Sequence, residues 1–428
     1  MSRLINSDPT QYAIEALEGF ALANSRYVKP VFGGVVRSTK TPEGKVALVV
    51  GGGSGHYPAF AGWVGPGFAD GAVAGNIFAS PSGSQAYSVC MAANRGGGVL
   101  IGYGNYAGDV LHFGQAIEQL KAQGIDARSL EVTDDIASAP KDQWQKRRGI
   151  AGDLPVFKIV AAACEAGKNI DEVVEVFHKA NERTRTFGVA FSGCTLPGSQ
   201  EPLFTVPKGK MGIGLGIHGE PGIDEQDLGT ADDLGKMLVD GLLGDRPDNS
   251  GKRVVALVNG LGSATYEDLF MVYRSVHKNL TDAGIEIVEG EADEFVTSLD
   301  MNGLSLTLVW LDDELEQLWT APCDTPAYRR GGVGDTERDD TVLNNEAIVA
   351  TVETPGSADS QALAGALASG LGAVAGLIAD NEKMLGDLDA VAGDGDHGIG
   401  MHRGSRAAAK EAERLASEGA GAQTLLVG

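Results

Sequence analysis

The sequence has few cysteines and few positive charges. Of its 428 residues, 4 are cysteine, and 34 are lysine or arginine against 58 aspartate or glutamate, so the formal net charge is −24 at pH 7. No two cysteines form a C-x-x-C pair, and we expect buried free thiols in a reducing cytosol. A strongly acidic chain repels nucleic acid and anionic membranes. Any phosphate that it binds must therefore be held by backbone N–H groups or by metal ions.

Several sequence signatures are also absent. The first residues contain no basic segment followed by an apolar core, so they do not resemble a signal peptide. We expect no apolar stretch long enough to cross a bilayer, and no G-x-x-x-x-G-K-[ST] phosphate loop occurs. These absences predict a cytoplasmic protein.

Up to about Thr320, strand-like runs alternate with helix-like runs. The strand-like runs are VALVV, GVLIG, TFGVAF, MGIGLGI, RVVALVNG and SLTLVWL, and the helix-like runs include DVLHFGQAIEQLKAQG and DEVVEVFHKANERT. This alternation predicts an α/β domain over residues 1–321 with largely parallel sheets. Turn-forming residues at 192–202 predict a boundary between two lobes there.

The composition changes after this region. Residues 322–345 are polar, contain glycine and proline, and show no periodicity, so we expect a linker. Residues 346–428 are rich in alanine, glycine, leucine and glutamate and contain no strand candidate. We expect an all-α region with room for roughly three helices.

A glycine-rich stretch, GGGSGHYPAF at 51–60, follows an apolar strand and should lead into a helix. Ligands bind at the carboxyl ends of strands in open α/β sheets, and glycines allow backbone N–H groups to approach them closely. We therefore expect Gly53, Ser54 and Gly55 to contact a substrate beside His56. A purely structural turn is the alternative.

Two further residues follow predicted strands. Asp109, in GYGNYAGDVLHF, lies just before a predicted helix, where its structural role would be that of an N-cap. Together with His56, its carboxylate also suits general acid/base chemistry. His218, in MGIGLGIHGEPG, ends a third strand, with Glu220 two positions on. A neutral imidazole is a nucleophile that can add to a carbonyl carbon and hold a ketone covalently. A structural histidine is the alternative there.

The stretch DLDAVAGDGDHG brings Asp389, Asp394 and Asp396 together. Three neighbouring carboxylates repel one another without a counter-charge. Hard cations with oxygen ligands resolve this repulsion, and Mg²⁺ carrying nucleotide phosphates is the usual case. A solvated acidic turn is the alternative.

In combination and in order, GGGSGHYPAF, NYAGD, GIHGEPG and LDAVAGDGDHG resemble the dihydroxyacetone kinase family in its single-chain, ATP-dependent form. The resemblance covers nearly the whole chain. It implies a two-lobed ketose-binding domain, followed at 346–428 by the start of a helical-barrel nucleotide domain, and a homodimer through the α/β domain.

The resemblance also implies roles for individual residues. His218 would form a hemiaminal with the carbonyl of the substrate, and His56 and Asp109 would be the acid/base pair. The three aspartates would hold two Mg²⁺ ions that bridge the ATP phosphates. The first nucleotide contacts would come from His397, Gly398, Ile399 and Gly400.

The chain departs from the family pattern in two places. Many relatives have lysine where this chain has Gly104, so we expect a larger or reshaped pocket and place D- or L-erythrulose level with dihydroxyacetone as substrate. The helical domain of the family has eight helices, and its later nucleotide contacts would lie beyond Gly428. We expect a truncated barrel that does not close and that exposes apolar faces.

Three hypotheses of function follow. The first is an ATP-dependent kinase of a short ketose. The second is a ketose-binding protein without catalysis, acting as a sensor or as an acceptor subunit phosphorylated by a partner. The third is a serine hydrolase that uses Ser54 and His218, although G-x-S-x-G fails because His56 stands where glycine is needed.

Overall fold

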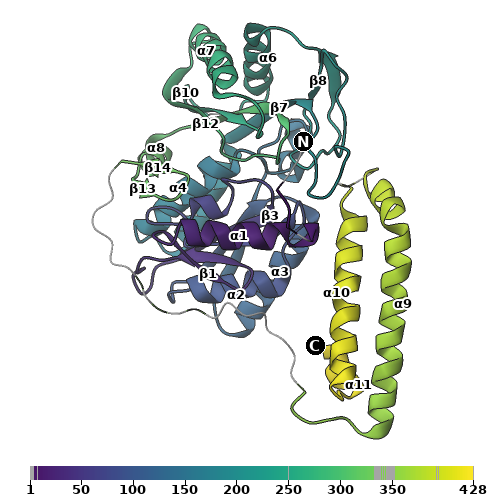
Figure 1. Ribbon diagram of the computed structural model, residues 1–428. Helices are drawn as coiled ribbons and strands as arrows, with labels where there is room; N and C mark the ends of the chain where they lie inside the picture. Colours follow the sequence, from purple (N-terminus) through teal and green to yellow (C-terminus); the bar gives the residue numbers. More distant parts are fainter. Residues whose placement is uncertain are drawn as a thin grey trace. The chain divides into compact units, whose positions relative to one another are not determined.

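The computed structural model describes residues 4–6, 8–248, 250–331, 339, 341, 343, 352–391, 393 and 395–427. The chain forms two compact units, Met1–Asn345 and Glu346–Gly428 (Figure 1). Residues 332–338, 340, 342, 344 and 345 of the predicted linker lie outside the described residues, and its first part belongs to the first unit. There, β13 (Cys323–Asp324) pairs with β14 (Arg329–Arg330), and Cys323 and Tyr328 are buried in the core.

The first sheet of the first unit has the strand order β1-β2-β4-β3-β5-β6. Its strands are β1 (Val28–Val31), β2 (Gly34–Arg37), β3 (Ala47–Ser54), β4 (Gly71–Ile77), β5 (Val99–Gly104) and β6 (Ala127–Val132). Strands β4, β3, β5 and β6 run parallel, whereas β1 and β2 pair antiparallel. The prediction of a largely parallel sheet is therefore confirmed for this lobe.

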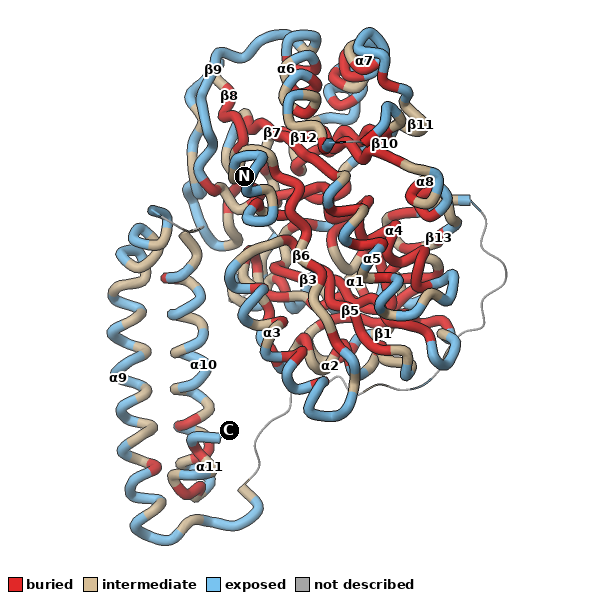
Figure 2. The backbone as a smooth tube through the Cα atoms, turned by 180° about the vertical axis from the view of Figure 1, so that it is seen from behind, coloured by how far each residue is buried: buried red, intermediate tan, exposed pale blue. Residues whose placement is uncertain are grey.

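Helices cover both faces of this sheet. They are α1 (Tyr12–Ala23), α2 (Gly83–Ala93), α3 (Ala107–Ala122), α4 (Asp153–Glu165) and α5 (Ile170–Glu182). Helices α2 and α3 share one apolar cluster with the sheet, and α1, α4 and α5 share another. Because both faces are covered, the central strands are buried throughout (Figure 2).

The second sheet has the order β11-β10-β12-β7-β8-β9. Its strands are β7 (Thr184–Ser192), β8 (Lys210–Ile213), β9 (Asp224–Asp227), β10 (Arg253–Gly260), β11 (Glu286–Asp293) and β12 (Asn302–Trp310). Helices α6 (Ala231–Gly244) and α7 (Tyr266–Asp282) pack on it, and α8 (Asp313–Trp319) follows β12.

Two predictions fail in this second lobe. Only β10 and β11 pair parallel, and the other pairs are antiparallel, because a buried apolar run has the same composition in either arrangement. The lobe boundary also precedes residues 192–202. Strand β7 already belongs to the second sheet, and the turn-rich stretch is a loop between β7 and β8.

Local signals explain where many helices begin. Helix α5 starts at a capping box. The side-chain oxygen of Asn169 accepts the backbone N–H of Glu172, and the carboxylate of Glu172 accepts the backbone N–H of Asn169. Thr230 and Asp233 form the same arrangement before α6. The expectation of free, buried cysteines is confirmed for all four.

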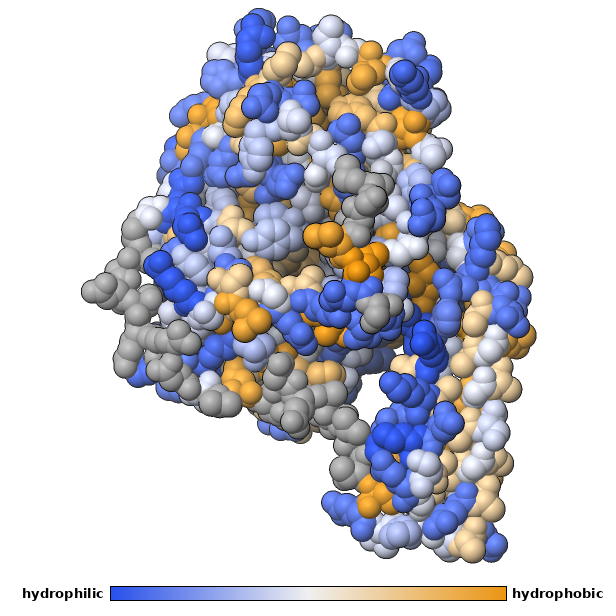
Figure 3. Space-filling view, in the orientation of Figure 1, coloured by the Kyte–Doolittle hydropathy of each residue, from blue (hydrophilic) through white to orange (hydrophobic). Residues whose placement is uncertain are grey.

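The second unit contains three helices within its described residues, as predicted: α9 (Ala358–Asp389), α10 (His397–Ser417) and α11 (Ala422–Val427). They share a small core around Ala364, Ala412 and Leu425. Apolar side chains along α9 are exposed, as expected (Figure 3), and these include Leu363, Val374, Leu377, Met384 and Leu388.

Helix α9 corrects one expectation from the sequence. It is long and apolar enough to cross a membrane by length and composition, and 6% of its most apolar window is buried. One such helix is weak evidence for a membrane span, because the core helix of a soluble protein passes the same test.

Candidate active site

The first four residues of the glycine-rich stretch are strand rather than loop. Residues Gly51 to Ser54 continue β3, where a Cβ on Gly51 or Gly53 would lie 2.8 Å from a backbone atom of β4 or of Ala79. Gly55 then turns the chain at φ +105°. The next regular element is a 3₁₀ turn, Ala61–Trp63, and not the expected helix. These glycines therefore allow close backbone packing at the end of β3.

His56 and His218 meet across the two lobes. Their Nε2 atoms lie 3.0 Å apart, and His56 is 2% exposed. His56 follows β3 directly. His218 lies in the turn between β8 and β9, because β8 ends at Ile213 and not at residue 217 as expected. The tertiary structure thus joins two histidines that are 162 residues apart.

The Nδ1 atom of each imidazole ring lies within hydrogen-bond distance of an acceptor. His56 Nδ1 lies 2.7 Å from the carbonyl oxygen of Thr297, and His218 Nδ1 lies 3.0 Å from Oε1 of Glu220. The second oxygen of Glu220 accepts the backbone N–H of His218 at 2.9 Å. Sequence reasoning noted Glu220 without a role, and it had no signal for Thr297, which comes from the loop before β12.

Aromatic rings enclose the pair. Phe78 stacks on His56 with ring centroids 4.9 Å apart, and it meets His218 edge-on at 5.3 Å. Tyr106 meets His218 edge-on at 4.8 Å. Phe78 has a backbone φ of +53°, which is uncommon outside glycine. With these rings around them, His56 is 2% exposed and the side chain of His218 is 12% exposed.

Burial and neighbouring charges decide the protonation of His56 and Glu220. Burial, with the charge of His218, lowers the pKa of His56 to about 3. Burial alone would raise the pKa of Glu220, but the charge and hydrogen bond of His218 and the charge of Arg148 lower it to about 2. Arg148 is itself held by Asp135 at 2.8 Å. At neutral pH, Glu220 is therefore ionised and His56 is neutral.

The geometry requires one further proton between the histidines. Each Nδ1 faces an acceptor, so each Nδ1 carries a hydrogen. Two bare Nε2 lone pairs would not approach to 3.0 Å, so one Nε2 must also carry a hydrogen. This hydrogen lies between the two Nε2 atoms, and the carboxylate of Glu220 lies beside the pair, 3.0 Å from His218 Nδ1.

Asp109 lies in the first turn of α3 and is 8% exposed. It is not the N-cap, because Tyr106 occupies that position. Asp109 is three residues beyond Tyr106, whose ring contacts His218. Its position relative to a substrate stays a prediction.

Gly104 has no open space beside it, so of the expected larger or reshaped pocket only the reshaped one stays a prediction. A Cβ at this position would lie 2.9 Å from the carbonyl oxygen of Gly149 and 3.0 Å from the ring of Tyr106. The space that a side chain would need is therefore filled. The argument for larger ketoses that rested on this residue is lost.

The acidic turn lies between α9 and α10. Asp389 ends α9, and its Oδ2 accepts the N–H groups of Gly395 at 2.9 Å and His397 at 3.3 Å. Asp396 occupies the N-cap position of α10, whereas Asp394 lies outside the described residues. The predicted nucleotide contacts, residues 397–400, form the first turn of α10.

This turn fits a magnesium nucleotide in its chemistry. Carboxylate oxygens suit Mg²⁺, and the N–H groups of a helix N-terminus suit phosphate. In the described part of the chain, no group of three or more His, Cys, Asp or Glu residues is close enough to hold a metal. The third carboxylate of the predicted set is Asp394, which lies outside that part.

Comparison with known proteins identifies the family. A model of the Dak1 domain matches residues 18–327, which is most of the first unit. This chain belongs to the Dak1 domain family. The expected resemblance to dihydroxyacetone kinases is thereby confirmed.

Curated relatives of this Dak1 protein include named kinases. The L-erythrulose kinase of Pectobacterium atrosepticum is 54% identical over 100% of this chain and 72% of its own length. The D-erythrulose kinase of Mycolicibacterium smegmatis is 54% identical over 100% of this chain and 74% of its own length. The crystal structure of the dihydroxyacetone kinase of C. freundii matches with a TM-score of 0.71 at 31% identity, covering 98% of this chain and 75% of that one. The same kinase in complex with AMP-PNP and Mg²⁺ matches with a TM-score of 0.70.

Proposed function

We propose that this Dak1 protein is an ATP-dependent kinase of a short-chain ketose. D-erythrulose, L-erythrulose and dihydroxyacetone are equal candidates for the substrate. A ketose kinase is supported by relatives that are 54% identical over the whole chain. The observation that carries the chemistry is the buried pair of Nε2 atoms at 3.0 Å, with Glu220 behind His218.

The pair can trap a ketone without an external acid or base. His56 Nε2 accepts the proton from His218 Nε2, which frees the lone pair of His218. This nitrogen bonds to the carbonyl carbon, the C=O π bond breaks, and the oxygen takes the proton back from His56. The product is a hemiaminal whose imidazolium ring is stabilised by the carboxylate of Glu220.

A terminal hydroxyl of the trapped ketose would then be phosphorylated. We assign proton acceptance from this hydroxyl to Asp109, and substrate contacts to the backbone of Gly53 and its neighbours. ATP would supply the γ-phosphoryl group, and Mg²⁺ would neutralise its charge. The carboxylates of Asp389, Asp394 and Asp396 would hold the metal, and residues 397–400 would contact the phosphates.

Native mass spectrometry tests the covalent step. The protein is incubated with dihydroxyacetone, D-erythrulose or L-erythrulose and compared with His218→Ala. Addition without loss of water predicts a gain equal to the full mass of the ketose, absent from His218→Ala. His277→Ala, an exposed histidine on α7, is the matched control and should retain the adduct. Adduct that persists in His218→Ala would contradict the proposal.

The same samples separate the kinase from the alternative of a ketose-binding sensor or acceptor subunit. Phosphorus NMR after addition of ATP and Mg²⁺ should show a ketose phosphate if the chain is a kinase. Adduct formation without any ketose phosphate would favour the binding protein. The homodimer stays a prediction of the resemblance, and the cytoplasmic location stays a prediction from the sequence signatures.

A further inference from the structure

A cavity of about 290 Å³ lies behind the glycine-rich strand, in the first unit. One wall is α1, through Leu17 and Phe20, and the opposite wall is the end of β3, at Gly53 to Gly55. Leu299, from the loop before β12, closes one side. His56, Asp109 and His218 do not line the cavity, which shares the end of β3, at Gly53 to Gly55, with the candidate active site.

The lining indicates what the cavity can bind. None of the described residues around it is charged, and most are aromatic, aliphatic or glycine. Four residues with a hydroxyl group line it, namely Tyr12, Ser54, Tyr57 and Thr297. Ser54 donates to the carbonyl of Gly75 at 2.7 Å, and Thr297 donates to the carbonyl of Tyr57 at 2.8 Å. Each hydroxyl oxygen can still accept a hydrogen bond. The cavity therefore offers apolar surface and hydroxyl groups, and no charged partner for an anion.

We propose that this cavity binds an uncharged, largely apolar small molecule that carries a hydroxyl donor, such as an aromatic or short-chain alcohol. Burial of apolar surface supplies the affinity, and an acceptor oxygen of Ser54 or Thr297 orients the hydroxyl group. ATP and sugar phosphates do not fit, because a charged group would be desolvated there without a counter-charge.

The cavity shares a wall with the histidine pair. Thr297 presents its hydroxyl to the cavity side and its carbonyl oxygen to His56 Nδ1. Gly55, at the edge of the cavity, accepts the backbone N–H of Leu299 at 2.9 Å. An occupant would thus contact the backbone that holds His56 without touching the imidazole.

Fluorine NMR of ligand binding tests the proposal on the whole chain. The probe is 4-fluorobenzyl alcohol, and 4-fluorobenzoate is the charged probe of similar shape. Ala16→Phe fills the rim of the cavity from α1, where Ala16 is exposed and the fold tolerates a larger side chain. Ile14→Phe, on the same helix and also exposed but outside the lining, is the matched control. Ala61→Leu blocks the cavity from a second element.

We expect saturable binding of the alcohol to the unchanged protein and to Ile14→Phe, and at least tenfold weaker binding to Ala16→Phe and Ala61→Leu. Thermal unfolding curves verify that each variant is folded. Equal binding to all four proteins, or equal binding of the benzoate, would overturn the proposal. Displacement of the alcohol by saturating dihydroxyacetone or erythrulose would also overturn it, because the cavity would then belong to the ketose site. None of these readouts uses phosphorylation, so they are independent of the kinase proposal.

Discussion

Glu220 is the carboxylate that contacts the histidine pair directly. It is 5% exposed and accepts both the backbone N–H and the Nδ1–H of His218. A carboxylate in this place fixes the tautomer of the ring and stabilises the imidazolium.

We predict that Glu220→Gln reduces hemiaminal formation and ketose phosphorylation by about 10²-fold or more. The amide has nearly the same size but no charge to stabilise the imidazolium. The measurement is the adduct fraction by native mass spectrometry, together with the pH profile of kcat, which a purely structural change would not shift. Glu291→Gln, a partly buried glutamate that accepts from Tyr328, is the matched control and should behave as the unchanged protein.

The free energy of unfolding should decrease as the pH is lowered, because of His56. Its pKa is about 3 in the folded protein and 6.5 when unfolded, so only the unfolded chain takes up the proton between these values. This contribution is fully present above pH 6.5 and is lost as pH falls towards 3. The slope from this residue reaches about 1.4 kcal/mol per pH unit.

Glu220 acts in the same direction at lower pH. Its folded pKa of about 2 lies below the ordinary 4.5, so its contribution is present above pH 4.5 and is lost below it. Urea unfolding at pH 7, 6 and 5 should therefore show a flatter pH dependence for His56→Gln than for the unchanged protein. Equal slopes for the two proteins would contradict the assignment.

At the scale of elements, the end of β3 depends on glycine because neighbouring backbone approaches it closely. A Cβ on Gly53 would lie 2.8 Å from the nitrogen of Ala79. We predict that Gly53→Ala destabilises the protein by about 1–3 kcal/mol in urea unfolding. Gly114→Ala, in α3 with nothing within 4 Å of the added Cβ, should be neutral or stabilise by up to about 1 kcal/mol.

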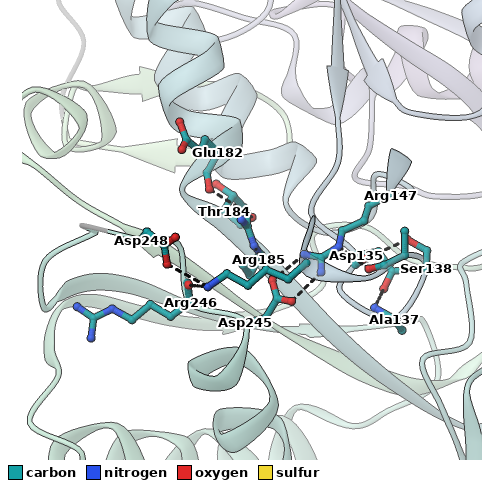
Figure 4. A network of polar contacts seen from close by, with 12 residues as sticks. Asp135, Ala137, Ser138, Arg147, Glu182, Thr184, Arg185, Asp245, Arg246 and Asp248 are labelled. Carbon is teal, nitrogen blue, oxygen red and sulfur yellow. Dashed lines mark hydrogen bonds and ion pairs between the residues drawn. The ribbon is translucent and has the colours of Figure 1, made fainter. Parts of the chain in front are cut away.

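A buried ion cluster ties the segment before α4 to the second lobe (Figure 4). Asp245, at the end of α6, accepts hydrogen bonds from Arg147 at 2.7 and 2.6 Å and from Arg185 at 2.9 Å. Both guanidinium groups are at most 2% exposed.

We predict that Asp245→Asn destabilises the protein by about 3–5 kcal/mol, because it leaves two buried cations without their anion. Asp248→Asn is the matched control. Asp248 is 90% exposed and pairs with Lys141, so its loss should change the free energy of unfolding by less than about 1 kcal/mol. Chemical unfolding followed by fluorescence measures both variants. Similar values for the two variants would contradict the role of the cluster.

At the scale of the whole molecule, the two units differ in the size of their cores. The first has three large apolar clusters, whereas the second has a small one around Ala364, Ala412 and Leu425. All four tryptophans, at positions 63, 144, 310 and 319, lie in the first unit.

We predict two unfolding steps. In urea, helical circular dichroism should begin to fall before tryptophan fluorescence changes, because the second unit unfolds first. Leu415→Ala, which removes a fully buried side chain from α10, should lower only the first midpoint. Leu388→Ala, 63% exposed on α9, is the matched control. Coincident transitions in both signals would show that the units unfold together.

The sequence by itself determined the motifs, the change to helices after residue 346 and the positions of six strands of the first unit, β3, β5, β7, β8, β10 and β12. These are local properties: apolar runs, glycine positions and charge spacing act within a few residues. The family followed from the same motifs and was confirmed.

Tertiary structure alone decided which segments meet. It decided the antiparallel pairing of the second sheet and the early lobe boundary. It also decided that the space at Gly104 is filled and that Thr297 and Phe78 contact His56. Each of these features depends on contacts between different segments of the chain. A buried strand has the same apolar composition in either direction, and a threonine 241 residues from its histidine leaves no local signal. The physical reason is that packing selects among partners that local sequence cannot distinguish.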